Sequence, residues 1–214
     1  MKEVFKDYMN DSIKLELWQK IGIGALVVSI AGFIGWIYEF IFYYFNFGMD
    51  KFYWQGGNFL PWINIYAFGA LLIIACTYKY KKSPIKVVLI STIVTGILEY
   101  LGGYFVYTFM DGLRLWDYNT EILNFGNING FICLRSVLCF GISSLALMYL
   151  ILPFFMYLSN HMNKKTFLII SITIVSIIMI DELYNLVFAR ILSLPRARDI
   201  YEPLGINYMT YKRG

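Results

Sequence analysis

LEYLGGYFVYTFMDGLRLWDY, residues 98–118, decides how the rest of the chain is interpreted. Glu99 lies inside an apolar run, which ends at Met110-Asp111 and is followed by Trp116-Asp117-Tyr118. A carboxylate within the hydrocarbon core of a bilayer costs about 2.5–3.5 kcal/mol on insertion scales, so residues of this kind are usually functional. We interpret the stretch as the outer half of a membrane helix that leads into an ordered external loop, with Glu99 as a candidate site residue.

The composition of the whole chain agrees with a membrane protein. Of its 214 residues, 59% are hydrophobic and 15% are charged, whereas a typical soluble domain carries about 25% charged residues. Long apolar runs predict helices over 21–45, 63–78, 85–110, 131–158 and 167–190. The expected fold class is all-α, an integral membrane helical bundle of about five transmembrane helices with two long external loops rich in Gly and aromatic residues.

Three regions follow from this interpretation. Residues 1–20 have charged and apolar residues at roughly helical spacing, which predicts an amphipathic segment at the membrane interface. A solvated helix that leads into the first span is the alternative. Residues 21–190 form the transmembrane helical domain, and residues 191–214 form a basic, aromatic tail that is too polar to span. The two long loops cover residues 46–62 and 111–130.

The distribution of Lys and Arg predicts the orientation. These residues are dense in the N-terminal segment and in the two short connections, and sparse in the two long loops. The positive-inside rule then predicts a multi-pass protein of the cell membrane with a cytoplasmic N-terminus and external long loops. The basic tail conflicts with this rule, because five helices place it outside. Either the rule fails there, or a helix or re-entrant segment has been miscounted.

Ionisable residues from four predicted helices fall at a similar depth. They are Glu39, Glu99, Arg135, Asp181 and Glu182. We expect them to line a polar cavity that opens outward beneath the two long loops. Arg135 is the single cation against four carboxylates, so at least one acid lacks an ion-pair partner, as in proton relays and cation sites of membrane proteins. The alternative is that these charges only pair with one another and hold the helices together.

Several catalytic patterns are missing from the sequence. It has no G-x-x-x-x-G-K-[ST] phosphate loop, no H-E-x-x-H or paired-cysteine zinc pattern, and no G-x-S-x-G nucleophile motif. We therefore expect no cofactor and no metal site, and the sequence favours a protein that is not an enzyme. No basic stripe with interleaved aromatic residues indicates a nucleic-acid partner.

Five segments occur in an order and spacing typical of a known family. They are GWIYE (35–39), WQGGNFLPWINIYAFG (54–69), LEYLGG (98–103), LWDYN (115–119) and NINGFICLRS (127–136). Over about residues 30–155 the chain resembles the ABC-transporter type IV (CmpB-like) family of bacterial multi-pass membrane proteins. The matching positions are Glu39, Tyr66, Glu99, Trp116, Asp117, Asn129 and Gly130. In the first loop, Gln55-Gly56 replaces the Arg-Gly pair usual in that family, which weakens the case for an anion contact there.

The resemblance implies a transporter or permease-type component in the lipid bilayer. A separate ATPase subunit would then be a partner, because this chain encodes none, and the solute would be small and polar or cationic. The candidate residues for binding substrate or protons are Glu39, Tyr66, Glu99, Trp116, Asp117, Asn129, Arg135, Asp181 and Glu182. Two alternatives stay open: a membrane-embedded enzyme that acts on a lipid or isoprenoid with carboxylates as acid and base, and a non-catalytic membrane scaffold.

Overall fold

The fold is almost entirely helical. The computed structural model describes residues 1–208 and the backbone of residues 212–213. Its elements are α1 (Lys2–Met9), α2 (Leu17–Asn46), α3 (Asn64–Thr77), η1 (Tyr78–Tyr80), α4 (Pro84–Phe109), β1 (Leu113–Arg114), α5 (Leu134–Ala146), η2 (Leu147–Ile151), α6 (Leu152–His161), α7 (Lys164–Leu183), η3 (Tyr184–Phe188), α8 (Ala189–Ile191), α9 (Ala197–Tyr201) and β2 (Lys212–Arg213). The two short strands pair antiparallel.

Four helical stretches are long and apolar enough to cross a membrane. They are Leu17–Asn46, Pro84–Phe109, Leu134–His161 and Lys164–Ile191. This confirms the predicted helical membrane bundle. The fifth predicted helix, α3, has 14 residues and is therefore about 21 Å long. It is shorter than the hydrocarbon core of about 30 Å, so the expected five spans become four long helices and one short one.

Local sequence explains where the helices begin and where one of them is irregular. Pro84 opens α4, where its missing N–H costs no helical hydrogen bond. The side chain of Asn163 caps α7 by accepting a hydrogen bond from the Lys165 backbone N–H at 2.9 Å. Between α5 and α6 the chain makes a π-helical stretch, Leu147–Ile151, which ends two residues before Pro153. A π-bulge of this kind interrupts the regular ladder without ending the helix.

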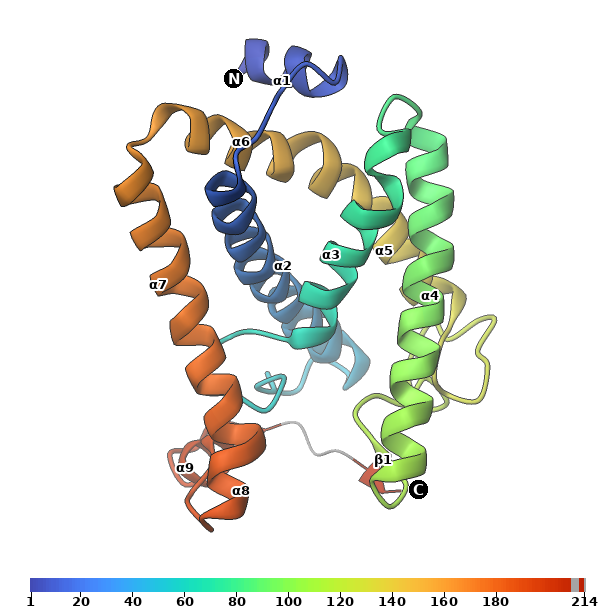
Figure 1. The fold of residues 1–214 in the computed structure, drawn as a ribbon. Coiled ribbons are helices and arrows are strands. Elements are labelled where there is room, and N and C mark those ends of the chain that lie inside the picture. The colour runs from blue at the N-terminus through green and yellow to red at the C-terminus, as the bar shows by residue number, and fades with distance from the viewer. Residues whose placement is uncertain (209–211, 214) are drawn as a thin grey trace.

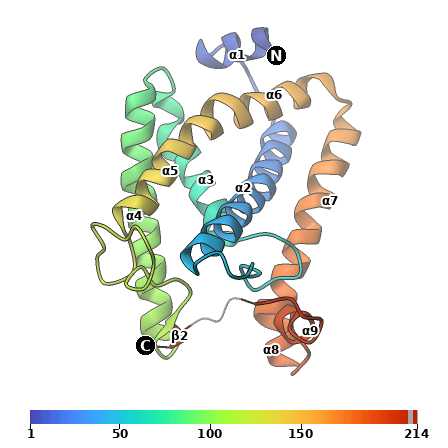
Figure 2. The ribbon, with the colours of Figure 1, turned by 180° about the vertical axis from the view of Figure 1, so that it is seen from behind.

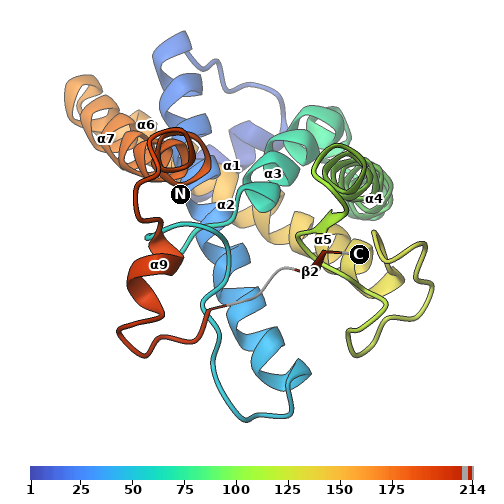
Figure 3. The same ribbon diagram turned by 90° about the horizontal axis from the view of Figure 1, so that it is seen from below.

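Helix α2 lies at the centre of the packing. It contacts α3 on one side and α7 on the other, while α3 contacts α4 and α4 contacts α5 (Figure 3). Small residues allow these close approaches. A Cβ atom added to Gly32 of α2 would lie 2.1 Å from the Trp62 indole nitrogen, and one added to Gly96 of α4 would lie 3.0 Å from Val137.

The connections divide between two ends of the bundle (Figures 1 and 2). Both long loops and the tail lie at one end, here named the loop end. Helix α1, η1 and the α6–α7 turn lie at the other, here named the N-terminal end. The tail is fixed to the first long loop: the Trp54 N–H donates to the Asn207 carbonyl oxygen at 2.7 Å, and the Tyr201 hydroxyl donates to the Phe59 carbonyl oxygen at 3.0 Å. The tail therefore lies at the same end of the bundle as the two long loops.

Candidate functional site

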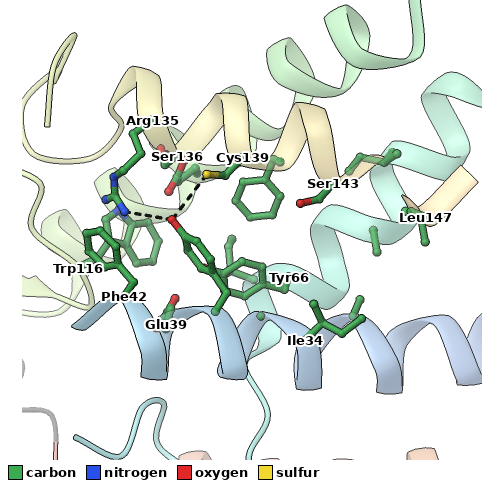
Figure 4. A pocket seen from close by; sticks show the side chains of 18 of the residues that line it. Ile34, Glu39, Phe42, Tyr66, Trp116, Arg135, Ser136, Cys139, Ser143 and Leu147 are labelled. Carbon is green, nitrogen blue, oxygen red and sulfur yellow. Dashed lines mark hydrogen bonds between the residues drawn. The ribbon is translucent and has the colours of Figure 1, made fainter. Parts of the chain in front are cut away.

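A cavity of about 280 Å³, here named the inner cavity, lies among α2, α3, α4 and α5 (Figure 4). Its walls differ along their length. Near the loop end they are polar and aromatic, with Tyr38, Glu39, Phe42, Tyr43, Tyr66, Glu99, Trp116, Tyr118, Glu121, Arg135, Ser136, Cys139 and Phe140. Farther into the bundle they are mostly apolar, with Ala31, Ile34, Ala70, Ile73, Ala146, Leu147 and Ile151. The inner cavity thus has a polar end and an apolar end.

Glu99 is one wall of the polar end and is only 5% exposed. One carboxylate oxygen accepts a hydrogen bond from the Tyr118 hydroxyl, and the other accepts one from Ser136 Oγ at 2.9 Å. Both partners are neutral. Buried carboxylates need such donors because desolvation without hydrogen bonds is costly. The contacts join α4 to α5 and to the second long loop, so Glu99 holds three elements together.

Arg135 makes its ion pair with a loop residue. Its Nη2 lies 2.6 Å from Glu121 Oε2, its Nη1 donates to the Tyr38 hydroxyl at 3.0 Å, and its guanidinium lies 3.8 Å from the centre of the Phe42 ring. Glu121 also accepts a hydrogen bond from the Tyr43 hydroxyl at 2.7 Å. Burial raises the pKa of Glu121 above its ordinary value, against the opposing effects of Tyr43 and Arg135.

Glu39 faces the cavity from α2 (Figure 4). Its carboxylate interacts with the Tyr66 hydroxyl. The Tyr66 ring packs on Gly35, where an added Cβ would lie 2.1 Å away, and stacks on Phe140 with ring centres 5.1 Å apart. Among the described residues, no Lys or Arg makes an ion pair with Glu39 or Glu99. Glu39 and Glu99 therefore lie in the wall of the inner cavity without a basic ion-pair partner in the described part of the chain.

A second cavity of about 500 Å³ adjoins the first at the loop end. The two cavities share Glu39, Ile65 and Trp116 in their walls. The second is otherwise lined by both long loops, the start of α3, the segment from α7 to α8, and the tail. Its polar residues there include Asn58, Asn64, Glu182, Arg190, Arg196, Arg198 and Tyr208. Glu39 therefore lies in the wall of both cavities.

Asp181 and Glu182 of α7 lie on this second side and fasten the first long loop. Asp181 accepts hydrogen bonds from the backbone N–H groups of Phe59, at 3.1 Å, and Leu60, at 2.7 Å. Glu182 accepts hydrogen bonds from the side chains of Asn58 and Asn64, the latter at 2.9 Å. The predicted group of five ionisable residues is thus divided: Glu39, Glu99 and Arg135 line the inner cavity, whereas Asp181 and Glu182 do not.

The candidates from the second long loop have separate positions. Trp116 lines both cavities and donates from its indole nitrogen to the Phe131 carbonyl oxygen at 2.8 Å. Asp117 and Asn129 line neither cavity. Asp117 accepts hydrogen bonds from Asn119 and lies 3.6 Å from Arg114. Asn129 has a φ of +54° in the turn with Gly130, and its carbonyl oxygen accepts from Arg114 at 3.0 Å. These two residues shape the loop that carries Trp116.

Sequence reasoning did not select Tyr38, Tyr118 or Glu121, although all three line the inner cavity. Tyr38 adjoins the selected Glu39, and Tyr118 adjoins the selected Asp117, so both lay in segments that were already under consideration. Glu121 had no comparable signal. It is one acid in a polar loop, and only the folding of that loop over α5 brings it to Arg135.

A family model described as "Putative ABC-transporter type IV" matches residues 26–186, which is most of the chain and includes every residue of the inner cavity. The chain belongs to this family. With its four spanning helices, this family member is a multi-pass membrane protein. No curated protein matches the chain, and no solved structure matches it.

Proposed function

We propose that this protein is the membrane-spanning component of a solute transporter and that the inner cavity binds a cationic solute. The observation that carries the proposal is the unbalanced charge at the polar end of the cavity. Arg135 is paired with Glu121, whereas Glu39 and Glu99 have neutral hydroxyl partners. Intramembrane carboxylates without a cationic partner are typical of transport pathways, and the family description names transporters.

The proposed orientation places the loop end outside the cell. The N-terminal end carries the lysines of the first segment and of both short connections, and cytoplasmic connections are enriched in Lys and Arg. Both long loops, the tail and the second cavity then face outward. Solute would reach Glu39 from the outside through the second cavity, since the two cavities share this side chain.

A separate ATPase is the proposed energy source, because the sequence contains no phosphate-binding loop. Such a subunit would act from the cytoplasm and would therefore contact the N-terminal end, where α1 lies across the bundle. Asp181 and Glu182 support transport indirectly in this proposal, by holding the first long loop at the wall of the second cavity.

Thermal unfolding of purified protein in nanodiscs tests the proposal. A library of small polar and cationic solutes is screened with wild type, Glu39→Gln, Glu99→Gln and the control Asp50→Asn, which removes an exposed acid at the same end. We expect at least one cation to raise the unfolding temperature of wild type and Asp50→Asn, and to lose this effect in Glu39→Gln. If no cation stabilises wild type, or if Glu39→Gln responds as wild type does, the inner cavity is not the binding site.

A further inference from the structure

The inner cavity limits which cations it can bind, beginning with its charged groups. Both Glu99 oxygens already accept hydrogen bonds from Tyr118 and Ser136, and Glu99 is buried. Glu121 is occupied by Arg135 and Tyr43. Glu39 is the remaining carboxylate, and it faces both cavities. A cationic group in the inner cavity would therefore lie beside Glu39.

Aromatic rings surround that position. Phe42, Tyr66 and Trp116 line the cavity near Glu39 (Figure 4). The rings of Tyr38 and Phe140 also line it and pack against Tyr66. The faces of aromatic rings attract ammonium groups, and quaternary ammonium ligands are commonly recognised by such cages. The protein's own Arg135 already lies over Phe42, with its guanidinium 3.8 Å from the ring centre. Because Glu121 balances the charge of Arg135, the arginine in the wall of the inner cavity does not oppose a second cation near Glu39.

The remaining length of the cavity is mostly apolar, with the hydroxyl of Ser143 as its polar group. From Glu39 its wall follows α2 back to Ala31, which corresponds to about 12 Å along the helix. Ile34 and Leu147 face each other across this part (Figure 4), and Ile73 and Ile151 also line it. Apart from the hydroxyl of Ser143, such a wall offers no side-chain oxygen to a bare metal cation or to the hydration shell of a hydrophilic amine. It favours a hydrocarbon group, whose transfer from water is favourable.

We infer that the solute is an amphipathic ammonium compound, with its cationic group at Glu39 among the aromatic rings and its hydrocarbon part between α2 and α5. This inference rests on the proposed function, because it assumes that the inner cavity is the solute site. It adds the chemical class of the ligand. The volume of about 280 Å³ is near the lower limit of small-molecule pockets, about 300 Å³, and accommodates a short chain only.

The test is a binding series on wild-type protein in nanodiscs of zwitterionic lipid, with empty nanodiscs as the control for partitioning into lipid. The probes are tetramethylammonium, butyltrimethylammonium, hexyltrimethylammonium, hexanol and hexanoate. We expect affinity to rise by about fourfold for each methylene that becomes buried, the equivalent of about 0.8 kcal/mol. Hexanol and hexanoate should bind far more weakly than hexyltrimethylammonium. Glu39→Gln should weaken hexyltrimethylammonium by roughly tenfold or more, and Asp50→Asn should not.

The outcomes separate the two proposals. If tetramethylammonium binds as well as hexyltrimethylammonium and binding depends on Glu39, the amphipathic class is wrong while a cation site in the inner cavity stands. The same conclusion follows if the library yields only hydrophilic cations. If hexanol binds as well as hexyltrimethylammonium, the ammonium group contributes nothing and the inference fails. If none of the probes binds and no cation from the library stabilises the protein, both proposals fail. The chain-length series uses wild type alone, so it does not depend on any variant that might misfold.

Discussion

Arg135 on α5 pairs with Glu121, a residue 14 positions earlier in the second long loop, through an Nη2–Oε2 contact of 2.6 Å. It does not pair with either intramembrane carboxylate of the inner cavity. The loop thus supplies the counter-charge for the single cation of the cavity wall, and the acids on α2 and α4 keep only neutral partners. This arrangement makes the second long loop part of the candidate binding site.

Removing Glu121 should destabilise the fold strongly. Glu121→Gln leaves the buried guanidinium of Arg135 without its ion-pair partner, and such losses typically cost about 3–5 kcal/mol. The measurement is the free energy of unfolding in mixed micelles, with Asp50→Asn as the control, which should change by less than about 0.5 kcal/mol. The double variant Glu121→Gln/Arg135→Met should recover part of the loss, because it leaves no buried charge unpaired. Equal stabilities of Glu121→Gln and Asp50→Asn would show that the pair does not stabilise the fold.

Two glycines of α2 form a matched pair for testing the cavity wall. A Cβ atom on Gly35 would lie 2.1 Å from the Tyr66 ring, whereas one on Gly24 would meet nothing within 4 Å. We expect Gly35→Ala to displace Tyr66, lower stability by about 1–3 kcal/mol and weaken cation binding. Gly24→Ala should be neutral or should stabilise the helix by up to about 1 kcal/mol. The measurements are the unfolding temperature and the affinity for the cationic probes, taken on both variants. Identical behaviour of the two would argue against close packing at Gly35.

The hydropathy of the sequence was sufficient to predict where the long helices lie. The runs predicted at 21–45 and 85–110 correspond to Leu17–Asn46 and Pro84–Phe109, because long apolar segments have few alternatives to a membrane helix. The structure does not bring all five predicted ionisable residues to one cavity. Three of the five, Glu39, Glu99 and Arg135, lie in the wall of one cavity, since residues at a common depth on neighbouring helices can converge.

The partners of those residues could not be predicted, because they depend on how loops fold back over the helices. Nothing local distinguishes Glu121 from the other polar residues of its loop, although it is 8% exposed and bound to Arg135. The same reason explains why Lys81 is buried, although a lysine in a basic connection is expected to be solvated. It is 1% exposed, because Asp11 and the ring of Tyr78 cover it.

The contact of Asp11 with Lys81 predicts a pH-dependent attachment of α1. Hydrogen bonds from Lys81 and Lys82 hold the pKa of Asp11 below its ordinary value of 3.8. A depressed pKa in the folded state stabilises the contact above the ordinary pKa, and this stabilisation is lost as the pH falls through the depressed value. Protection of residues 1–16 against hydrogen exchange, relative to the intrinsic rate at each pH, should therefore decrease on acidification below about pH 4.

Asp11→Asn should show faster exchange of the same residues already at neutral pH, and no further step attributable to this group on acidification. The matched control is Asp7→Asn in the neighbouring turn, since Asp7 accepts a hydrogen bond from Ser12 but makes no ion pair with the described lysines. If exchange in Asp11→Asn at neutral pH equals that of wild type, the attachment of α1 does not depend on this pair.

The most direct measurement uses Cys139, a native thiol in the wall of the inner cavity that lies 3.7 Å from the Tyr38 hydroxyl. A small, positively charged methanethiosulfonate reagent is applied to protein in which Cys76 and Cys133 are replaced by serine. The account predicts that the reagent modifies Cys139, and that it does so more slowly in Glu39→Gln. Hexyltrimethylammonium should protect Cys139 in the protein that retains Glu39 but not in Glu39→Gln. Modification that is equally fast with and without Glu39, and that no cation slows, would contradict the claim that the inner cavity binds a cationic solute.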